Sequence, residues 1–380
     1  MARPAVPRYL GEDFTETPPG HRFTLYGAFW EADWQRVKNI APADLKRDFG
    51  TLTPQVVKLR DALRNRQAQI AATLGRAVWT IEAQSIAPFV TGTGIEHPLE
   101  NGMAFLNPYG LPYLPGSGVK GMVRRAAEEL RDDVFGEGTQ GWDQTAIDSL
   151  FGKQTESGDT DTEPTRGALT FWDVVPQCDR LAVDIMNPHY DAYYQGKTPP
   201  TDCGQPVPIF FLTVPTQTPL TFHIQCDCTR LPKGWPPEHW RTLLDTAVAH
   251  AFDWLGFGAK TAVGYGAMRR NLEQEQKNRQ GAAQRQRQAV ESALPAEQKA
   301  LNELRRWFEE DQAAQRKEPG GRVVNRLNAL LNEGPDWPKA EREALAMLAE
   351  AVYGYLDWGS GKKKQERKAK IQRLREEEST

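Results

Sequence analysis

The sequence lacks long apolar segments. No stretch approaches the about 18 consecutive apolar residues that a membrane-spanning helix needs. The N-terminal residues, Met-Ala-Arg-Pro-Ala-Val-Pro-Arg, contain no apolar core of a signal peptide, so secretion is not expected. Only 4 cysteines occur among 380 residues, which is too few for a disulfide framework and favours a reducing compartment. These absences predict a cytoplasmic protein that makes no membrane contact.

An excess of charge of one sign is also missing. The chain has 47 Lys and Arg against 50 Asp and Glu, a net charge of −3. No overall positive field attracts nucleic acid, so any nucleic-acid site must be local. Because 39% of the residues are hydrophobic, the chain can bury a core, and disorder of the whole chain is excluded. At roughly 150 residues per domain, its length allows about two domains.

The composition changes near residue 270. Beyond it the chain is rich in Gln, Arg, Glu and Ala, and Leu272–Ser292, with few apolar residues, is typical of a polar helix or a linker. Three apolar helical patterns follow, and the basic run Lys362–Arg375 predicts a helical or frayed tail in solvent, with RNA or protein contact as the alternative. We therefore expect an N-terminal extension, partly helical, at 1–75, a central domain at 76–270 and a charged helical extension at 271–380.

The central domain predicts an α+β fold. Residues 77–87 alternate like a half-buried strand, with Trp79, Ile81 and Ala83 on one face. Helices are expected at 54–74, 119–131 and 239–255, and further strands at 168–175, 209–214, 221–226 and 263–269. The order strand, helix, strand, strand, helix, strand is that of the ferredoxin-like βαββαβ unit. The stretch 180–207 is then an insertion in its second half.

A first glycine-rich segment, Leu114-Pro-Gly-Ser-Gly-Val-Lys-Gly121, precedes a helix. It satisfies G-x-G-x-x-G, but the prolines before it suit a loop and no acidic residue ends a second strand, so dinucleotide binding is rejected. Ser117 predicts an N-cap, and the helix amides with Lys120 and Arg124 on one face suit a phosphate. The alternative is a capped helix with solvated basic residues.

A second segment, Gly256-Phe-Gly-Ala-Lys-Thr-Ala-Val-Gly-Tyr-Gly266, lies between a helix and a strand. A P-loop is rejected, because there Lys follows Gly directly and the order is strand, loop, helix. A loop of small residues with Lys260 and Thr261 suits a phosphodiester, and Tyr265 offers a stacking surface. A tight structural turn is the alternative.

Both segments, in this order and topology, resemble the RAMP superfamily of CRISPR proteins. Phe89–Gly94, His97–Gly102, Leu111–Gly121, Asp184–Tyr190 and Pro208–Leu212 are similar to one subgroup, the sixth Cmr-type subunit of type III-B effector complexes. The resemblance covers roughly residues 75–270. It implies an RRM-like ferredoxin fold and a non-catalytic subunit that caps the backbone filament, binds the 3′ part of the guide CRISPR RNA and helps hold complementary target RNA. The implied partners are both RNAs and other Cmr-type RAMP subunits.

The resemblance also implies which residues contact RNA. In the first segment they are Ser117, Gly118, Lys120 and Arg124, and in the second Gly256, Gly258, Lys260 and Thr261. We add Arg125 for its position in the first turns of the helix and Tyr265 for its stacking surface. The insertion corresponds in position to the thumb-like hairpin of RAMP backbone subunits. The residues in it that we expect to contact RNA or a neighbouring subunit are Asp184, His189, Tyr190 and Tyr193.

A RAMP-type endoribonuclease acting on guide precursor or target RNA is the alternative function. Asp184, His189 and Asp191 have the residue types for metal-independent acid–base cleavage, although beside Pro188 they equally suit a turn. His97 is the nearest candidate for a processing histidine, and its Pro/Gly-rich surroundings favour a structural role. A purely architectural protein is the third hypothesis.

No metal or cofactor is expected. His223, Cys226 and Cys228 follow H-x-x-C-x-C, which is not a standard zinc-finger spacing, and strand alternation places the histidine and the cysteines on opposite faces. Buried core cysteines are the preferred interpretation.

Overall fold

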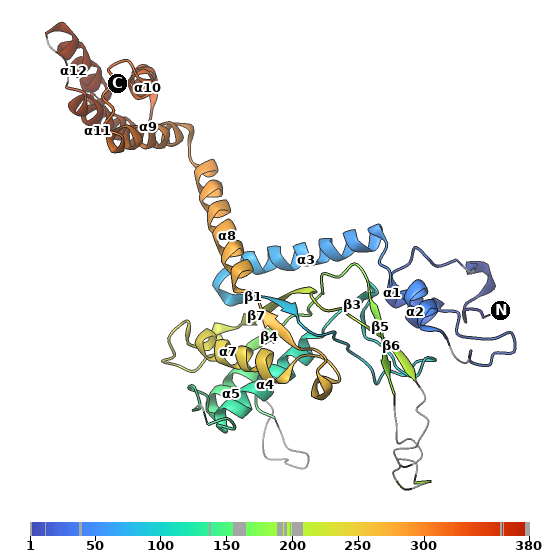
Figure 1. Cartoon of the computed structure of the whole chain (residues 1–380). Coiled ribbons are helices and arrows are strands. Elements are labelled where there is room, and N and C mark those ends of the chain that lie inside the picture. The colour runs from blue at the N-terminus through green and yellow to red at the C-terminus, as the bar shows by residue number, and fades with distance from the viewer. Residues whose placement is uncertain are drawn as a thin grey trace. The chain divides into compact units, whose positions relative to one another are not determined.

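The computed structural model describes residues 2–11, 13–37, 40–136, 138–154, 165–187, 193, 196–197, 199, 208–357, 359 and 361–376. The chain divides into two compact units, Met1–Gln276 and Lys277–Thr380, and each is described by itself (Figure 1). Among the described residues, no helix has the length and apolar character that crossing a membrane requires.

A four-stranded antiparallel sheet organises the first unit. The strands lie in the order β4-β7-β1-β8, with bounds Leu169–Phe171, Pro219–Cys226, Val78–Ser85 and Met268–Arg270. The predicted alternation of β1 is confirmed, because Trp79, Ile81 and Ala83 are all buried. The register sets Ile81 opposite Phe222 of β7, so that both apolar side chains enter the same core.

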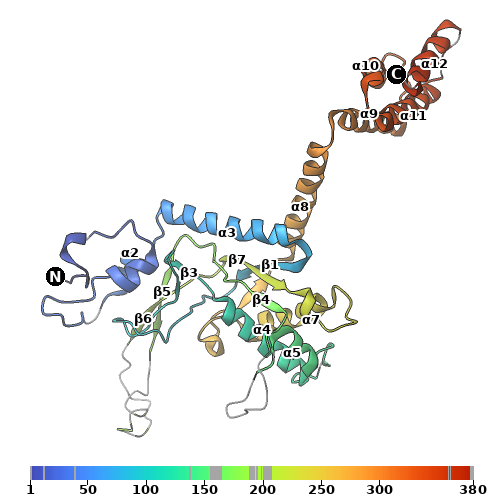
Figure 2. The same ribbon diagram turned by 180° about the vertical axis from the view of Figure 1, so that it is seen from behind.

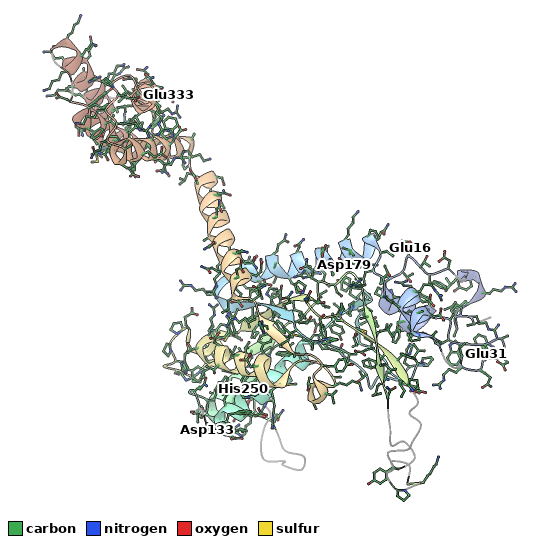
Figure 3. The ribbon with its side chains drawn as sticks, in the orientation of Figure 1. Glu16, Glu31, Asp133, Asp179, His250 and Glu333 are labelled. Carbon is green, nitrogen blue, oxygen red and sulfur yellow. The ribbon has the colours of Figure 1, made fainter. Side chains whose placement is uncertain are left out.

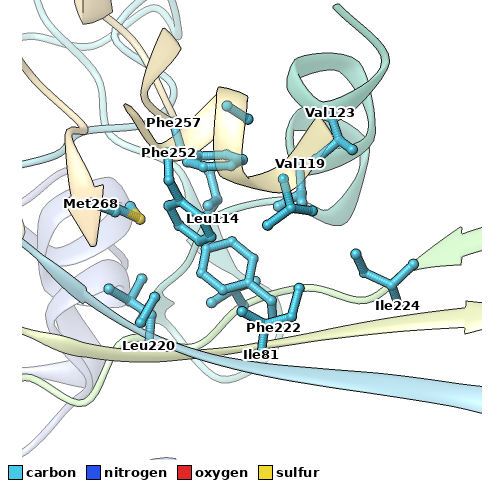
Figure 4. Packing of buried hydrophobic residues seen from close by; sticks show 14 of the residues in the cluster. Ile81, Leu114, Val119, Val123, Leu220, Phe222, Ile224, Phe252, Phe257 and Met268 are labelled. Carbon is cyan, nitrogen blue, oxygen red and sulfur yellow. The ribbon is translucent and has the colours of Figure 1, made fainter. Parts of the chain in front are cut away.

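Helices cover the apolar face of this sheet (Figure 1). They are α4 (Gly116–Arg131), α5 (Gln144–Phe151) and α7 (His239–His250), and α7 continues as the π-helical turn η5 (Ala251–Leu255). Val119 and Val123 of α4 pack with Phe252 and Phe257 over Phe222 of the sheet (Figure 4). This core fixes α4 and the segment after η5 on one scaffold.

A long helix, α3 (Pro54–Leu74), lies across the opposite face of the sheet in both views (Figures 1 and 2). Its predicted start is confirmed: Pro54 follows the N-cap Thr53, whose side chain accepts a hydrogen bond from a first-turn amide. Two polar contacts connect it to the sheet side. Arg64 donates to Thr221 Oγ1 at 3.2 Å, and Gln67 donates to the Asp173 carbonyl at 2.8 Å. Buried Arg60 pairs with Asp179 beside the helix (Figure 3).

A two-stranded sheet joins the start of the insertion to the strand that follows it. Strand β5 (Ala182–Met186) pairs antiparallel with β6 (Ile209–Thr213), and Val183 lies opposite Leu212. The strand expected at 209–214 therefore forms, but it pairs with β5 and not with the four-stranded sheet. A shorter pair joins β2 (Phe105–Leu106) to β3 (Leu111–Pro112).

The N-terminal residues contribute to the core of the first unit. Their helical elements are η1 (Arg8–Leu10), α1 (Pro19–His21), η2 (Arg22–Tyr26) and α2 (Pro42–Phe49). Three further short helical turns occur later in the first unit, namely η3 (Gly75–Ala77), η4 (Cys228–Arg230) and η6 (Thr261–Val263). The His97 ring stacks on Phe23 at 3.9 Å between centroids, and its Nε2 lies 2.9 Å from the Phe23 carbonyl. Burial lowers the pKa of His97, as expected of a histidine that packs in a core.

The second unit is built from helices. The polar helix α8 (Leu272–Ala293) begins at the end of the first unit and continues into the second. It is followed by α9 (Ala296–Ala313), α10 (Arg322–Glu333), η7 (Gly334–Asp336), α11 (Lys339–Tyr355) and α12 (Lys362–Arg375). Leu304, Leu327 and Leu345 lie in its core. The segment 362–375 is helical, which was one of the predicted alternatives. The prediction that it is a tail in solvent is wrong, because Ile371 and Leu374 of α12 are 3% and 2% exposed and join this core.

Candidate nucleic-acid interface

Helix α4 begins at Gly116, one residue before Ser117, the residue predicted to be its N-cap. Pro115 occupies the N-cap position without a side-chain cap, so the prediction of Ser117 as N-cap is wrong. The Asp173 carboxylate, 57 residues away in sequence, instead accepts a 2.8 Å hydrogen bond from the Gly116 amide. A Cβ at Gly116 would overlap the Phe171 carbonyl, so this glycine lets α4 pack directly on β4. The first glycine of the motif is therefore explained by the fold.

The other two glycines of the first segment face open space. A Cβ added at Gly118 or Gly121 would meet no atom within 4 Å, and Ser117 beside them is exposed. Glycine inside a helix costs up to about 1 kcal/mol relative to alanine, so folding alone favours alanine here. The result is an exposed patch on one side of the first turns of α4, formed by Ser117, Gly118 and Gly121, that another molecule can approach closely; we call it the Ser117–Gly121 strip, although Val119 between them is buried.

Cationic side chains gather beside this strip. Lys120 is half-buried, and its pKa is lowered by that burial and then by the positive charges of Arg124 and Arg166. Arg124 is already engaged by Glu128 and the Gly152 carbonyl, both at 2.9 Å. Lys120 and Arg166, by contrast, have no acidic partner in the part of the chain that the structure describes.

Arg125 projects from the exposed side of the same helix. It donates to Glu129 at 2.8 Å, and Glu129 also contacts His250 at 2.9 Å (Figure 3 labels His250). Sequence reasoning named Arg125 but missed Arg166. Arg166 precedes β4 and lies 46 residues after Lys120, and no local pattern relates the two residues.

The second glycine-rich segment is a folded turn. Gly256, Gly258 and Gly266 have φ values of +71°, +99° and +75°, which only glycine adopts readily. A Cβ at Gly258 would lie 2.5 Å from the Val90 carbonyl, and one at Gly266 would overlap the carbonyl of Phe257. These glycines allow backbone to pack on backbone, which agrees with the structural-turn alternative for their positions.

The polar side chains of this segment face the β5–β6 pair. Lys260, in a left-handed conformation with φ of +61°, donates to Met186 Sδ at 2.8 Å and lies 5.5 Å from the Phe211 ring. Tyr265 donates to Asp184 at 2.7 Å, and burial together with that carboxylate raises its pKa to about 12. Thr261 begins the short turn η6. The segment therefore anchors the insertion at its base.

The backbone of Val90 and Thr91 links the two glycine-rich segments. The Ala259 amide donates to the Val90 carbonyl at 2.8 Å. The Thr91 hydroxyl donates to the Tyr113 carbonyl at 2.9 Å, three residues before α4. One short stretch of chain therefore bonds both to the second segment and to the residue just before the first. Lys260 contacts Met186 and Phe211, whereas the charges that act on Lys120 are those of Arg124 and Arg166.

The insertion residues named from the sequence are described only in part. Asp184 contacts Tyr265 and the amide of Ile185, and Tyr193 is 47% exposed. His189, Tyr190 and Asp191 lie outside the described residues.

The residues weighed as zinc ligands point apart. His223 Nδ1 lies 3.0 Å from Thr80 Oγ1, and burial lowers the pKa of His223 to about 4. Cys226 is buried in the core on the other face of β7, and Cys228 is exposed. Within the described ranges, no group of three or more His, Cys, Asp or Glu side chains is placed to hold a metal ion.

Comparison with known proteins identifies the domain. Residues 82–269 match the model of the RAMP superfamily, so the chain contains a RAMP domain. Over 226 residues the chain is 28% identical to the CRISPR system Cmr subunit Cmr6 of Pyrococcus furiosus. That match covers 47% of this chain and 64% of the relative, which is less than two thirds of the relative's length.

Two solved structures are also similar. The crystal structure of Cmr6 from Pyrococcus furiosus is 27% identical and covers 51% of this chain and 98% of its own, with a TM-score of 0.27. The cryo-EM structure of the type III-B Cmr-beta complex bound to cognate target RNA contains a chain that is 20% identical. That match covers 60% of this chain and 69% of the other, with a TM-score of 0.40.

Proposed function

We propose that this protein is a non-catalytic RNA-binding subunit of a type III-B (Cmr) CRISPR effector complex. The RAMP domain and the similarity to Cmr6 support this proposal. The strand order β4-β7-β1-β8, with α4 and α7 as the two crossover helices, supports a ferredoxin-like assignment for the domain at 76–270. The segments at 1–75 and 271–380 then extend this common domain.

The observation that carries the proposal is the exposed backbone strip Ser117–Gly121 beside Lys120 and Arg166. Bare helix backbone admits a ribose-phosphate chain at close range, and the two cations neutralise phosphate charge. In the complex, this strip binds the 3′ part of the guide CRISPR RNA in the cytoplasm. Complementary target RNA pairs with the guide, so specificity comes from base pairing. Other Cmr-type RAMP subunits adjoin the protein where it caps the filament.

The salt dependence of RNA binding tests this site. A phosphate contact contributes about 0.7 to the slope of log K against log salt for single-stranded RNA. Lys120→Gln with Arg166→Gln should make the slope for a guide-length RNA shallower by about 1.4. The matched control, Lys58→Gln with Lys233→Gln, removes two exposed charges elsewhere in the first unit and should leave the slope unchanged.

Lys260 is tested separately, because its side chain contacts Met186 and Phe211. If Lys260 also neutralises a phosphate, Lys260→Gln lowers the slope by a further 0.7 or so. An unchanged slope for Lys120→Gln with Arg166→Gln would remove the strip as the RNA site. Cleavage of labelled RNA by the purified protein, abolished by Asp184→Asn, would instead favour an endoribonuclease.

A further inference from the structure

Helix α12 carries a concentrated positive charge. Its residues Lys362–Arg375 contain eight basic side chains and one acidic side chain, Glu366. The helix is held in place by its own apolar residues, since Ile371 and Leu374 are buried against the core of the second unit. The basic side chains therefore form a fixed array on a folded surface.

Three of the eight basic residues take part in packing the helix. Arg375 pairs with Glu350 of α11 at 2.9 Å, Arg367 lies 4.5 Å over the ring of Tyr353, and Lys370 reaches Asn332 at 3.5 Å. The other five are exposed and have no acidic partner within the described part of the chain. We call them the α12 cation array: Lys362, Lys363, Lys364, Lys368 and Arg373.

The position of the first three lysines does not help the helix. They occupy the first turn of α12, where the helix dipole favours acidic side chains, and no acidic residue lies in that turn. Burial of Ile371 and Leu374 does not require these lysines either. A polyanion bound to the array would offset the unfavourable interaction of these lysines with the helix dipole.

We propose that the α12 cation array binds the phosphate backbone of RNA, as a second contact beyond the strip on α4. This inference rests on the proposed function for its choice of RNA as the polyanion. Helix α12 contains no aromatic residue on which a base could stack, so the contact is made through charge alone. Binding by the array is therefore insensitive to base sequence and sensitive to salt.

The test uses the full chain with Lys362–Lys364 each changed to Gln. Glutamine keeps the helix propensity of lysine, and circular dichroism and thermal melting verify that the second unit stays folded. The expected result is an RNA-binding slope against log salt that is shallower by about 2, equally for two RNAs of unrelated sequence. The control changes Lys46, Lys58 and Lys233 to Gln, which removes the same charge from exposed positions of the first unit and should leave the slope unchanged.

The outcomes separate this inference from the proposed function. If the slope is unchanged by the α12 variant but falls with Lys120→Gln and Arg166→Gln, the array does not bind RNA while the proposed function stands. If the α12 variant alone reduces the slope, the array binds RNA and the strip on α4 does not. A variant that keeps its RNA slope but no longer copurifies with other subunits would show that α12 docks an acidic protein surface, which also overturns the inference.

Discussion

The two glycine-rich segments look alike in sequence and differ in what their glycines do. In the first, Gly118 and Gly121 lie on the exposed side of α4, and a Cβ added at either would meet no atom within 4 Å. In the second, Gly258 and Gly266 are pressed against the backbone of Val90 and Phe257 at positive φ. One set of glycines leaves a surface accessible, and the other lets the chain turn on itself.

This difference predicts that replacing the two kinds of glycine changes the stability of the protein in opposite directions. Substitution of a glycine that the fold requires must lower stability, because the added Cβ meets backbone. Substitution of a glycine that only leaves space must raise stability, because alanine is the better helix former. The following predictions use that contrast.

The largest effect is expected at Gly266. Gly266→Ala should lower the free energy of unfolding by about 4 kcal/mol, because a Cβ would overlap the Phe257 carbonyl and the residue has positive φ. Denaturant unfolding measures it. Gly264→Ala is the matched control, since Gly264 also has positive φ but faces open space, and it should cost only about 1–2 kcal/mol. Equal effects at both positions would show that crowding plays no part.

A smaller effect tests whether the second segment anchors the insertion. Tyr265→Phe should lower the free energy of unfolding by about 1 kcal/mol through loss of the hydrogen bond to Asp184. Combined with Asp184→Asn in a double-mutant cycle, the two changes should be non-additive. Additive changes would contradict an anchoring contact.

The same contact has a defined pH dependence. The pKa of Tyr265 is raised from its ordinary value of 10 to about 12, so the folded state holds the phenolic proton more tightly than the unfolded state. Its stabilising contribution is present below pH 10 and is lost as the pH rises from 10 through 12. The stability difference between the wild type and Tyr265→Phe should therefore shrink over that range. A constant difference would argue against the shifted pKa.

The smallest stability change is expected at Gly121, and its sign is opposite. Gly121→Ala should raise the free energy of unfolding by about 0.5–1 kcal/mol and yet weaken binding of guide RNA, because the methyl group occupies the strip. The control Asn65→Ala, at an exposed position of α3, should stabilise by a similar amount and leave RNA binding unchanged. If Gly121→Ala binds RNA as well as the wild type, the open strip serves no ligand.

Sequence periodicity predicted most of the framework. The alternation in β1 and the apolar spacing of α7 are properties of neighbouring residues, so they can be read locally, as can the helix start at Pro54. The partner of β6 could not be read, because strand pairing depends on residues distant in sequence. The burial of Ile371 and Leu374 was missed for a related reason. Two apolar residues among many charged ones give a weak local signal, and the residues that bury them lie on other helices of the second unit.

The candidate site was predictable in part. The sequence indicated the small residues and Lys120 through their position before a helix. The Asp173 carboxylate at the helix start and the approach of Arg166 depend on how β4 packs beside α4, so no motif encodes them. The contacts of Lys260 and Tyr265 with the insertion were missed because both residue types equally suit RNA.

The position of α3 determines whether the sheet can recognise the bases of an RNA. Sheets of the RNA-recognition type display aromatic rings on an open face, where nucleotides stack and are identified one by one. Here Arg64 and Gln67 hold a 21-residue helix across that face. A sheet covered by a helix cannot stack on individual bases, so the proposed binding of guide RNA should be equally tight for guides of any spacer sequence.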